Sequence, residues 1–542
     1  MSFEIRDRDL LARLGKIKTK SGILETPSLL PVINPAVQPI PPKKMSELLN
    51  CKALITNAYI IKKHFENKAI HKGIHDLLDF DGVLMTDSGA YQILVYGDIK
   101  TSPEEIVRYQ EEINTDIATI LDVPTGWEVS REYAKQTVKK TLKRAKELSK
   151  MKTRDDIVWV GPVQGGNYLD LVAKSAKEMG KLPFEIHALG SPTPVLEQYL
   201  FGTLVDMIFT AKMNLPLDRP LHLFGAGHPF MFALAVALGC DLFDSAAYAI
   251  YARKDRYMTE YGTANLGKLA YFPCSCPVCS GNDPKKLRET PKGEREKLLA
   301  QHNLNVCFSE IRRIRQAVVE GRLWEYLETR AYGHPSLLQA LKRLRKYEDY
   351  LERSSPVTKR RGLFFFSSAG LTRPEIVRHR KRLSESYLPP RGAKILVLLP
   401  QTRTKPFHKS EEQRRLDKAI QHKIGTRARR IHICTYAAPF GVVPVEIDEI
   451  YPLSQYESTD SFDAETIDYV AEQVENYIMK TNYDRVILLQ RSETWKGKIA
   501  AVCKRACTKR SLPLTTFKMR RLWSENELDE ILAVIQEAVC VK

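Results

Sequence analysis

The amino-acid sequence predicts an α/β protein whose larger part is an eight-stranded (β/α)8 barrel, the TIM barrel. Short apolar runs alternate with amphipathic stretches over about 250 residues, which is the typical size of such a barrel. Polar residues follow most of these runs, as they do where barrel strands end at a common mouth. In chain order the eight predicted strands are Ile23–Pro31, Ala53–Asn57, Gly82–Thr86, Ile117–Asp122, Ile157–Val163, Phe184–Leu189, Leu221–Gly225 and Asp241–Asp244.

Helical patterns fill the intervals between the predicted strands. The clearest are Pro103–Asn114, Ser130–Lys150 and Pro194–Met213. An open dinucleotide-binding sheet would carry a Gly-x-Gly-x-x-Gly turn after a strand. The stretch from Gly225 to Gly227 starts that pattern, but Phe230 stands in the place of the third glycine. The pattern therefore favours a barrel over an open sheet.

Seven polar residues share one position, at or just past the carboxyl end of a predicted strand. In a barrel these ends converge on the mouth, where chemistry is carried out. For Asp87 and Asp244 a helix N-cap is an equally good explanation. The seven residues are Asn57, Asp87, Asp122, Gln164, Ser191, His228 and Asp244.

Three of the ten cysteines lie within six residues, at Cys274, Cys276 and Cys279. Structural zinc sites take four ligands in a tetrahedral arrangement. His302, 23 positions after Cys279, is the nearest candidate for the fourth ligand. We expect one structural Zn2+ ion per chain, because a complete set of four ligands leaves no open position for catalysis. The other seven cysteines are scattered, which is typical of reduced core cysteines.

The positive charge of the chain is concentrated in one segment. The net charge is +18, and Leu341–Arg430 holds 25 Lys and Arg against 8 Asp and Glu, or +17. A local excess of this size fits contacts with a polyanion, most simply a nucleic acid. A solvated surface is the alternative reading of the same charges.

The alternation of strands and helices stops after the barrel and begins again near Arg391. We predict a barrel with its zinc-binding insertion over residues 1–325, a basic helical linker over 326–390 and a small C-terminal α/β domain over 391–542. The elements expected after the barrel are helices Asn305–Gly321 and Pro335–Leu351, strands Ala393–Leu399, Ile431–Thr435 and Arg485–Leu489, and helix Ala464–Lys480.

The sequence carries no signal of export or membrane insertion. No apolar run approaches the roughly 20 residues of a membrane span. The segment Met1–Lys20 is charged throughout and lacks the apolar core of a signal peptide. We therefore expect a cytoplasmic protein that does not enter a membrane.

Four segments of the barrel region carry specific motifs: Thr86-Asp87-Ser88-Gly89-Ala90-Tyr91-Gln92, Gln164-Gly165-Gly166, His187-Ala188-Leu189-Gly190-Ser191-Pro192 and Asp241-Leu242-Phe243-Asp244-Ser245-Ala246. These motifs, with the Cys-x-Cys-x2-Cys and later His, resemble those of tRNA-guanine transglycosylases. Leu121–Thr125 and Phe224–Pro229 resemble the archaeal branch. The resemblance covers residues 1–390 and implies replacement of guanine at position 15 of the tRNA D-arm by 7-cyano-7-deazaguanine, the first step towards archaeosine.

The residues agree with the chemistry that this resemblance implies. Exchange of a base with the ribose configuration retained requires two displacements at C1′, and hence two carboxylates. Asp244 and Asp87 are the predicted catalytic pair. The resemblance favours Asp244 as the nucleophile and Asp87 as the acid/base, and the sequence leaves the reverse assignment open.

The incoming purine is expected to bind at the same mouth. Asp122 and Gln164 carry donors and acceptors for its Watson–Crick edge. The backbone at Gly190 can approach a flat base closely because glycine has no side chain. Tyr91 is a candidate for stacking on the base, or else for wall packing. The predicted substrate-binding residues are Ser88, Tyr91, Asp122, Gln164, Gly190 and Ser191.

The expected partners are tRNA, guanine and 7-cyano-7-deazaguanine. Archaeal relatives often end in an RNA-binding PUA domain, which the segment after Lys504 does not resemble. A separate PUA-domain chain is therefore one further expected partner, and a second copy of this chain is another.

Two rival functions stay open at this point. The segment Leu399–Ser410 is similar to the Pro-Cys-x3-Lys-Pro-Tyr-x2-Ser-x2-His signature of archaeosine synthases, with Lys405 retained but Gln401 in place of the Cys. Such a paralogue would modify the deazaguanine already in tRNA. The other rival is a non-catalytic tRNA-binding subunit. Both catalytic carboxylates are present, which favours base exchange over either rival.

Overall fold

The computed structural model describes residues 3–90, 101–190, 192–490, 494–518 and 525–540. The chain forms two compact units, Met1–Tyr347 and Glu348–Lys542. The division falls inside the segment 326–390 that the sequence predicts as a linker. Each unit has its own sheet and its own buried core.

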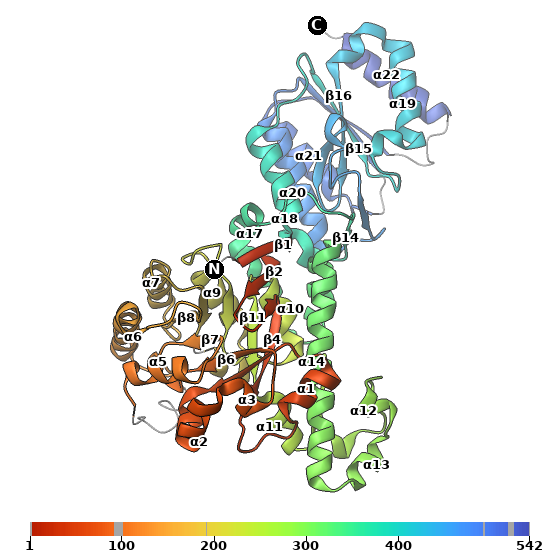
Figure 1. Cartoon of the computed structure of the whole chain (residues 1–542). Coiled ribbons are helices and arrows are strands. Elements are labelled where there is room, and N and C mark those ends of the chain that lie inside the picture. Colours follow the sequence, from red (N-terminus) through yellow and green to blue (C-terminus); the bar gives the residue numbers. More distant parts are fainter. Residues whose placement is uncertain (1–2, 91–100, 191, 491–493, 519–524, 541–542) are drawn as a thin grey trace. The chain divides into compact units, whose positions relative to one another are not determined.

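Eight parallel strands close into a barrel in the first unit (Figure 1). Each strand pairs with the next one along the chain, and β11 pairs with β4 to complete the ring. The predicted (β/α)8 fold class is confirmed. The barrel strands are β4 (Ser28–Ile33), β5 (Ala53–Asn57), β6 (Val83–Asp87), β7 (Ile117–Thr119), β8 (Val158–Val163), β9 (Ile186–Leu189), β10 (Leu221–Leu223) and β11 (Leu242–Ser245).

The first predicted strand, Ile23–Pro31, is wrong as a single element because the chain changes sheets within it. The backbone N–H of Thr26 donates to the carbonyl of Gly15 at 2.9 Å, whereas that of Ser28 donates to the carbonyl of Asp241 at 2.9 Å. The proline between them has no N–H to contribute to either sheet. The first part belongs to an unpredicted antiparallel sheet of β1 (Phe3–Asp9), β2 (Ala12–Lys18) and β3 (Ile23–Glu25).

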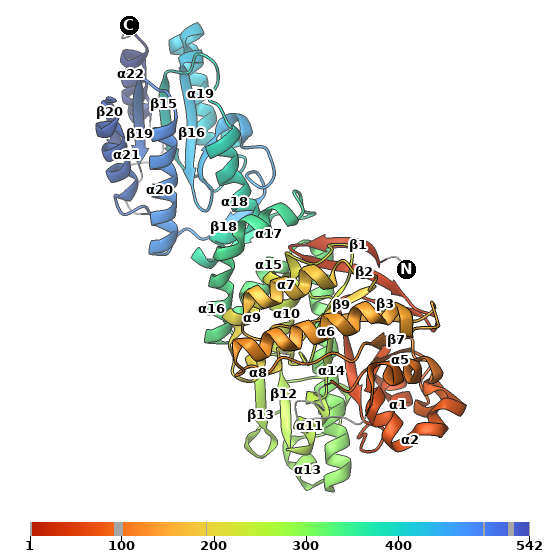
Figure 2. The ribbon, with the colours of Figure 1, turned by 90° about the vertical axis from the view of Figure 1, so that its left-hand side faces the viewer.

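Helices surround the barrel (Figure 2). The predicted helix Pro194–Met213 is two helices, because Tyr199 has a φ of 57°, which an α-helix cannot continue. None of the described helices is both long and apolar enough to cross a bilayer. The helices between the strands are α1 (Pro42–Leu49), α2 (Ala58–Lys72), α3 (Ile74–Leu78), α5 (Pro103–Glu112), α6 (Arg131–Met151), α7 (Leu169–Met179), α8 (Thr193–Glu197), α9 (Phe201–Lys212), α10 (Pro229–Ala237) and α11 (Ala247–Arg253).

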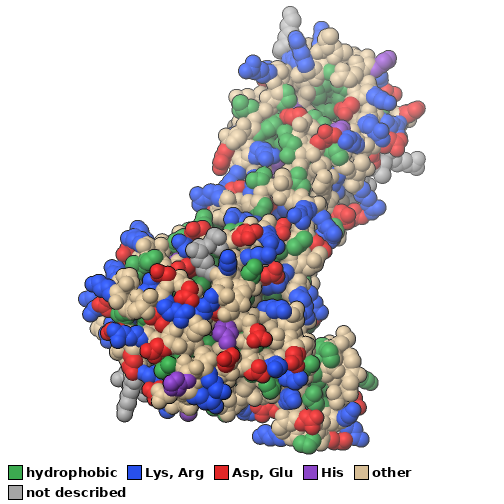
Figure 3. Space-filling view, in the orientation of Figure 1, with side chains coloured by type: hydrophobic (Ala, Val, Ile, Leu, Met, Phe, Trp, Pro, Cys, Tyr) green, Lys and Arg blue, Asp and Glu red, His purple; other side chains and the backbone are tan. Residues whose placement is uncertain are grey.

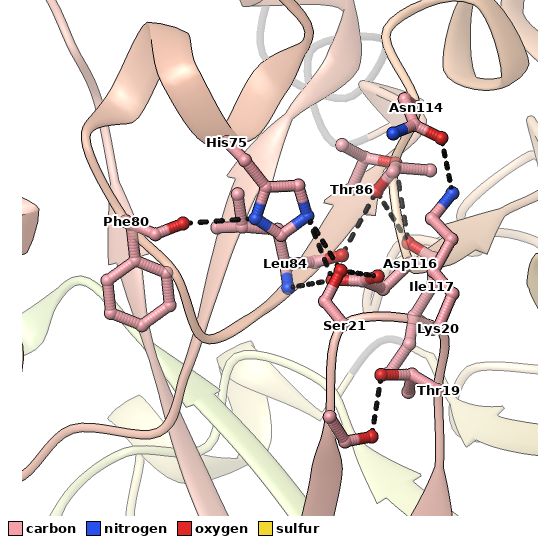
Figure 4. A network of polar contacts seen from close by, with 12 residues as sticks. Thr19, Lys20, Ser21, His75, Phe80, Leu84, Thr86, Asn114, Asp116 and Ile117 are labelled. Carbon is pink, nitrogen blue, oxygen red and sulfur yellow. Dashed lines mark hydrogen bonds and ion pairs between the residues drawn. The ribbon is translucent and has the colours of Figure 1, made fainter.

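A polar network centred on Asp116 ties the amino end of the barrel together (Figure 4). The fully buried carboxylate of Asp116 accepts hydrogen bonds from the backbone of Leu84 at 2.7 Å and the hydroxyl of Ser21 at 2.6 Å. The Nε2 atom of His75 lies 3.2 Å away. Burial by itself would raise the pKa of Asp116, but these hydrogen bonds outweigh it and lower the pKa. The network lies before β7 and therefore opposite the mouth.

An insertion follows β11 and carries the clustered cysteines. Its elements are β12 (Arg256–Thr259), β13 (Gly262–Asn265), η1 (Leu266–Lys268), α12 (Pro277–Ser280) and α13 (Pro284–Glu289). The long helix α14 (Lys292–Glu320) packs against α11 and β12, and the predicted helix Asn305–Gly321 is its second half. Helices α15 (Leu323–Ala331) and α16 (Pro335–Arg343) and the turn η2 (Leu344–Tyr347) complete this unit.

The second unit is a five-stranded sheet with helices on both faces (Figures 1 and 2). On β15, Leu396 and Leu398 face a core shared with α20 and α21, whereas Ile395 and Val397 face one shared with α19 and α22. The sheet, in spatial order, is β17 (Gly441–Pro444), β16 (Ile431–Ala437), β15 (Ile395–Pro400), β19 (Arg485–Gln490) and β20 (Leu514–Lys518). The helices are α17 (Glu348–Ser354), α18 (Pro374–Lys381), α19 (Glu411–Ile424), α20 (Ala464–Lys480), α21 (Lys498–Lys509) and α22 (Glu525–Cys540).

Part of the positive charge in the basic segment is used inside the second unit. Arg378 lies 2.8 Å from Glu352, and Arg380 lies 2.7 Å from Glu348, so that α18 is tied to α17. Lys381 also reaches Glu352, at 3.3 Å. On the face shown in Figure 3, basic side chains (blue) are interspersed with acidic ones (red) instead of forming one continuous band. The formal charge of the segment therefore overstates what it offers to a polyanion.

Candidate active site in the barrel mouth

The carboxyl ends of the barrel strands carry the polar residues that the sequence predicts to share one mouth. Six of the seven lie among the described residues: Asn57 (end of β5), Asp87 (end of β6), Asp122 (after β7), Gln164 (after β8), His228 (after β10) and Asp244 (in β11). Gly190, a predicted binding residue, follows β9. The predicted site residues Tyr91 and Ser191 lie outside the described residues.

Asp244 is held by two hydrogen bonds to the same oxygen. Nε2 of His222 lies 2.9 Å from Oδ1 of Asp244, and the backbone N–H of Gly225 donates to this oxygen at 2.9 Å. Among the described residues no donor reaches Oδ2. The carboxylate is thus fixed in orientation while one of its oxygens keeps its lone pairs available.

His222 is not among the site residues predicted from the sequence. The strand register brings His222 next to Asp244. His222 on β10 pairs with Leu242 on β11, and Asp244 lies two residues further along β11. Side chains two residues apart in a strand share a face, so His222 and Asp244 point to the same side of the barrel wall. In the sequence itself, the feature that could have been noticed is a histidine inside the otherwise apolar predicted strand Leu221–Gly225.

Asp87 has a different environment from Asp244. Its Oδ2 accepts a hydrogen bond from Nδ2 of Asn57 at 3.2 Å. Burial, together with the negative charges of Asp122 and Asp244, raises the pKa of Asp87 to about 7. Three carboxyl groups therefore influence one another in this mouth, and Asp87 is the one whose proton affinity is raised to the neutral range.

Asp122 and Gln164 form a fixed pair. Nε2 of Gln164 donates to Oδ2 of Asp122 at 2.5 Å, and Oε1 of Gln164 accepts from the backbone N–H of Thr125 at 2.9 Å. Burial raises the pKa of Asp122 to about 6, even though the bond from Gln164 opposes this shift. The backbone N–H of Thr125 also fixes which end of the Gln164 amide carries oxygen.

Gly190 is required by the side chain of Gln164. A Cβ atom at position 190 would lie 2.3 Å from Nε2 of Gln164, closer than two such atoms can approach. The side chain nearest to Gly190 is therefore that of Gln164, which is itself a predicted binding residue. From the sequence, Gly190 is expected only to allow a flat base to approach closely, and its packing against Gln164 is not expected.

Ser88 is fully buried next to Asp87. Its Oγ has no hydrogen-bond partner among the described residues. Buried hydroxyl groups in folded proteins are nearly always paired, so an unpaired one in a mouth is suited to a ligand.

The four predicted metal ligands also lie together. The ligand atoms of Cys274, Cys276, Cys279 and His302 are all within 4.8 Å of one another. The sulfur atoms of Cys276 and Cys279 are 3.6 Å apart and lie 3.4 and 3.3 Å from Nδ1 of His302. This group could hold a metal ion.

Neighbouring groups orient the metal-ligand cluster. Nε2 of His302 lies 2.9 Å from the carbonyl oxygen of Met258, and donation to that oxygen leaves Nδ1 free to face the sulfurs. The ring of Tyr257 stacks on that of His302 with a centroid separation of 3.7 Å, and its hydroxyl lies 3.2 Å from the sulfur of Cys279. The cluster therefore joins β12 to α12 and α14.

Comparison with known proteins identifies the family. Residues 8–336 match the family described as queuine tRNA-ribosyltransferase, and residues 376–535 match a domain of unknown function, DUF5591. The chain is 45% identical over 478 residues to a tRNA-guanine(15) transglycosylase of Methanocaldococcus jannaschii, covering 86% of this chain and 70% of the relative. A protein of the same name from Sulfolobus acidocaldarius is 40% identical over 496 residues, which is 90% of this chain and 95% of the relative. The resemblance noted in the sequence is confirmed, and this chain belongs to the queuine tRNA-ribosyltransferase family.

Proposed function

We propose that this protein replaces guanine at position 15 of tRNA with 7-cyano-7-deazaguanine through a covalent RNA–enzyme intermediate, in archaeosine biosynthesis. The observation that carries this proposal is the pair of carboxyl groups, Asp87 and Asp244, which share one mouth but have different hydrogen-bond partners. The names of the relatives support tRNA as the substrate and position 15 as the target.

In the first displacement Oδ2 of Asp244 attacks C1′ of nucleotide 15. The bond from C1′ to the guanine nitrogen breaks, its electron pair leaves with guanine, and an ester forms between Asp244 and the ribose. His222 and Gly225 keep their bonds to Oδ1, so the carboxylate is oriented before the substrate arrives.

Asp87 supplies the proton that the departing guanine needs. Because its pKa is raised to about 7, the carboxyl group can hold a proton near neutral pH and release it again. Its carboxylate then takes the proton from the ring nitrogen of the incoming base, which attacks C1′ and releases Asp244. The raised pKa of Asp87 supports this assignment of roles, which the sequence leaves open.

The Asp122–Gln164 pair suits the Watson–Crick edge of the purine. The carboxylate of Asp122 offers acceptors beside the amide of Gln164, and the hydroxyl of Ser88, unpaired among the described residues, adds a further donor or acceptor. Gly190 leaves room for the Gln164 side chain in the same wall. Tyr91 and Ser191 complete the proposed binding set from the sequence alone.

Zinc is the metal that suits the Cys3His cluster. With Zn–S bonds of about 2.3 Å and Zn–N bonds of about 2.0 Å, a tetrahedral site separates two sulfurs by about 3.8 Å and a sulfur and a nitrogen by about 3.5 Å. The distances between the ligand atoms of Cys276, Cys279 and His302 are close to these values. Three thiolates and an imidazole fill all four positions, so the ion would be structural.

The second unit offers less support for a synthase-like activity. Burial lowers the pKa of Lys405, which by itself would favour a nucleophilic role. Against that role, Nζ of Lys405 lies 4.4 Å from the ring centroid of Tyr456, a cation–π contact that favours the charged form. Gln401, which stands where the synthase signature has a cysteine, accepts a hydrogen bond from the backbone of Ala438 at 2.8 Å. A cation–π contact and a structural glutamine favour a supporting role for this segment. A non-catalytic subunit is disfavoured because both carboxyl groups are present.

Phosphate contacts are best assigned to cations that acidic side chains do not already neutralise. We define the basic surface by four exposed residues of α19 and η6 (Gly425–Arg430): Arg414, Lys418, Arg427 and Arg429. None of the four forms an ion pair with a described residue, in contrast to Arg378 and Arg380. A cytoplasmic location, a second copy of the chain and a separate PUA-domain chain stay predictions.

Asp244→Asn is expected to lower exchange by about a thousandfold or more while the protein stays folded. The amide oxygen can still accept from His222 and Gly225, but the amide nitrogen has no lone pair for attack at C1′. Incorporation of labelled guanine into unmodified tRNA measures the effect. Asp218→Asn, at an exposed aspartate, is the matched control and should behave as wild type. Turnover near the wild-type value in Asp244→Asn would contradict the two-displacement mechanism.

The pH dependence of exchange should follow the protonation of Asp87. The pKa of this group is raised to about 7, so the acid form that protonates guanine is lost above that pH. We expect kcat/KM for tRNA to fall about tenfold per pH unit well above pH 7. Asp87→Asn should remove this dependence together with most of the activity. A wild-type profile that is flat from pH 6 to 9 would refute the assigned role.

Removal of the metal should destabilise the insertion. Metal analysis is expected to find one zinc ion per chain. Cys279→Ser should lose the ion and melt at a lower temperature, since Cys279 of α12 belongs to a buried core and His302 is a buried residue of α14. Cys540→Ser, at an exposed cysteine of α22, is the control and should keep the metal. Protein purified without chelators that contains no zinc would overturn this proposal.

Replacing the basic surface with four glutamines should weaken tRNA binding and flatten its salt dependence. Each lost phosphate contact removes about 0.9 from the slope of log affinity against log salt concentration. Binding of tRNA across a salt series measures this slope.

The matched control removes four exposed lysines of the barrel helix α6: Lys139, Lys140, Lys146 and Lys150. An unchanged slope in the basic-surface variant, or an equal change in this control, would mean that α19 is only solvated surface. The choice of incoming base, made in the mouth, should stay the same in both variants.

A further inference from the structure

Aromatic side chains form a strip on the surface beside the barrel mouth. Three of them are unusually exposed for tyrosines, namely Tyr199 at 49%, Tyr261 at 53% and Tyr332 at 57%. They come from three different connections: α8–α9, β12–β13 and α15–α16 (Figure 2). We define the aromatic strip as Tyr199, Tyr251, Tyr261, Tyr332 and His334.

Ring contacts hold one part of the strip together. Tyr199 and His334 stack with their centroids 5.1 Å apart and their planes 15° from parallel. Tyr261 packs against Gly333, where an added Cβ would lie 2.7 Å from its ring. Gly333 stands between Tyr332 and His334, so the residues of the α15–α16 connection lie beside the tip of the β12–β13 hairpin.

A chain of rings links the strip to the loop after β10. The Tyr251 ring is 6.4 Å from that of His228, which is 4.4 Å from Phe230, and Phe230 is 6.0 Å from Tyr199. The same loop contains Gly225, whose backbone N–H donates to the catalytic carboxylate. The aromatic strip therefore begins at the segment that orients the proposed nucleophile.

Two arginines support rings of the strip in different ways. Arg330 is almost fully buried, pairs with Glu310, and lies 5.4 Å from the Tyr261 centroid, so it holds this ring from the protein side. Arg256 is exposed and lies 5.8 Å from the Tyr251 centroid. The strip thus combines exposed rings with an exposed cation beside the half-buried Tyr251, and aromatic side chains together with cations are what proteins use to bind unpaired nucleotides.

Base exchange creates a need for such a surface. The target guanine must leave the RNA stack to reach Asp244, and its unpaired neighbours then lose a stacking partner. Aromatic side chains can stack on any of the four bases, because every base has a π-face. Because the aromatic strip starts at the mouth, it lies where the nucleotides that flank the target guanine would contact the protein.

We propose that the aromatic strip binds the unpaired nucleobases that flank the exchanged guanine of tRNA, by stacking on Tyr199 and its neighbours in the strip. This inference rests on the proposed function, because it takes tRNA as the substrate. It adds a second contact area for the RNA, next to the mouth and independent of the recognition of the exchanged base.

The test uses the full chain with Tyr199→Ala, Tyr199→Phe and Tyr271→Ala. Tyr271 is 84% exposed and lies outside the strip, so it is the matched control. We expect Tyr199→Ala to raise the Kd for unmodified tRNA about fivefold or more, with kcat for guanine exchange retained. The Phe variant keeps the ring and should bind as wild type does. The salt slope should stay the same, because no charge is removed.

A second readout reports stacking directly. tRNA carrying 2-aminopurine at an unpaired position beside nucleotide 15 should lose fluorescence on binding the wild type, and less on binding Tyr199→Ala. Equal Kd values and equal quenching in all variants would overturn the proposal, as would Tyr199→Ala changing the oligomeric state without changing RNA binding. If the wild-type protein does not exchange guanine at all, the proposed function is refuted instead. Failure of the aromatic-strip proposal and failure of the proposed function are therefore distinguishable.

Discussion

The crowding of three carboxyl groups in one mouth is the constraint on which the proposed chemistry depends. Asp87, Asp122 and Asp244 come from separate strands, and the charges of the latter two help to raise the pKa of Asp87 to about 7. The surrounding donors make the groups unequal: His222 and Gly225 bond Asp244, whereas Asn57 bonds Asp87. In the proposed mechanism, these unequal partners allow Asp244 to attack while Asp87 carries a proton.

The rest of the barrel unit keeps these groups in place. Closure of the sheet between β4 and β11 fixes the distance between strand ends, and the Asp116 network ties β6 and β7 together at the opposite end. The Cys3His cluster joins β12 to α14, and α14 packs on α11 directly after Asp244. Loss of any of these constraints would displace the carboxyl groups of the mouth, although none of the constraining residues contacts the substrate in the proposed mechanism.

Much of this arrangement could be predicted from the sequence. The eight strands followed from apolar runs, and the proposed catalytic aspartates followed from polar residues at strand ends and from family motifs. What failed depended on tertiary pairing: the split at Thr26 reflects a change of hydrogen-bond partner, and the role of His222 depends on the register between β10 and β11. The ion pairs of Arg378 and Arg380 were also hidden, because a count of charges does not show which ones are neutralised locally.

The most direct test of the account is to identify the residue that becomes bonded to RNA. Wild-type protein would be incubated with unmodified tRNA, denatured and digested, and the peptide that retains a nucleotide would be sequenced by mass spectrometry. We expect the modification on Asp244, and we expect Asp244→Asn to yield no adduct. An adduct on Asp87, or one that persists in Asp244→Asn, would contradict the assignment of nucleophile and acid on which the mechanism rests.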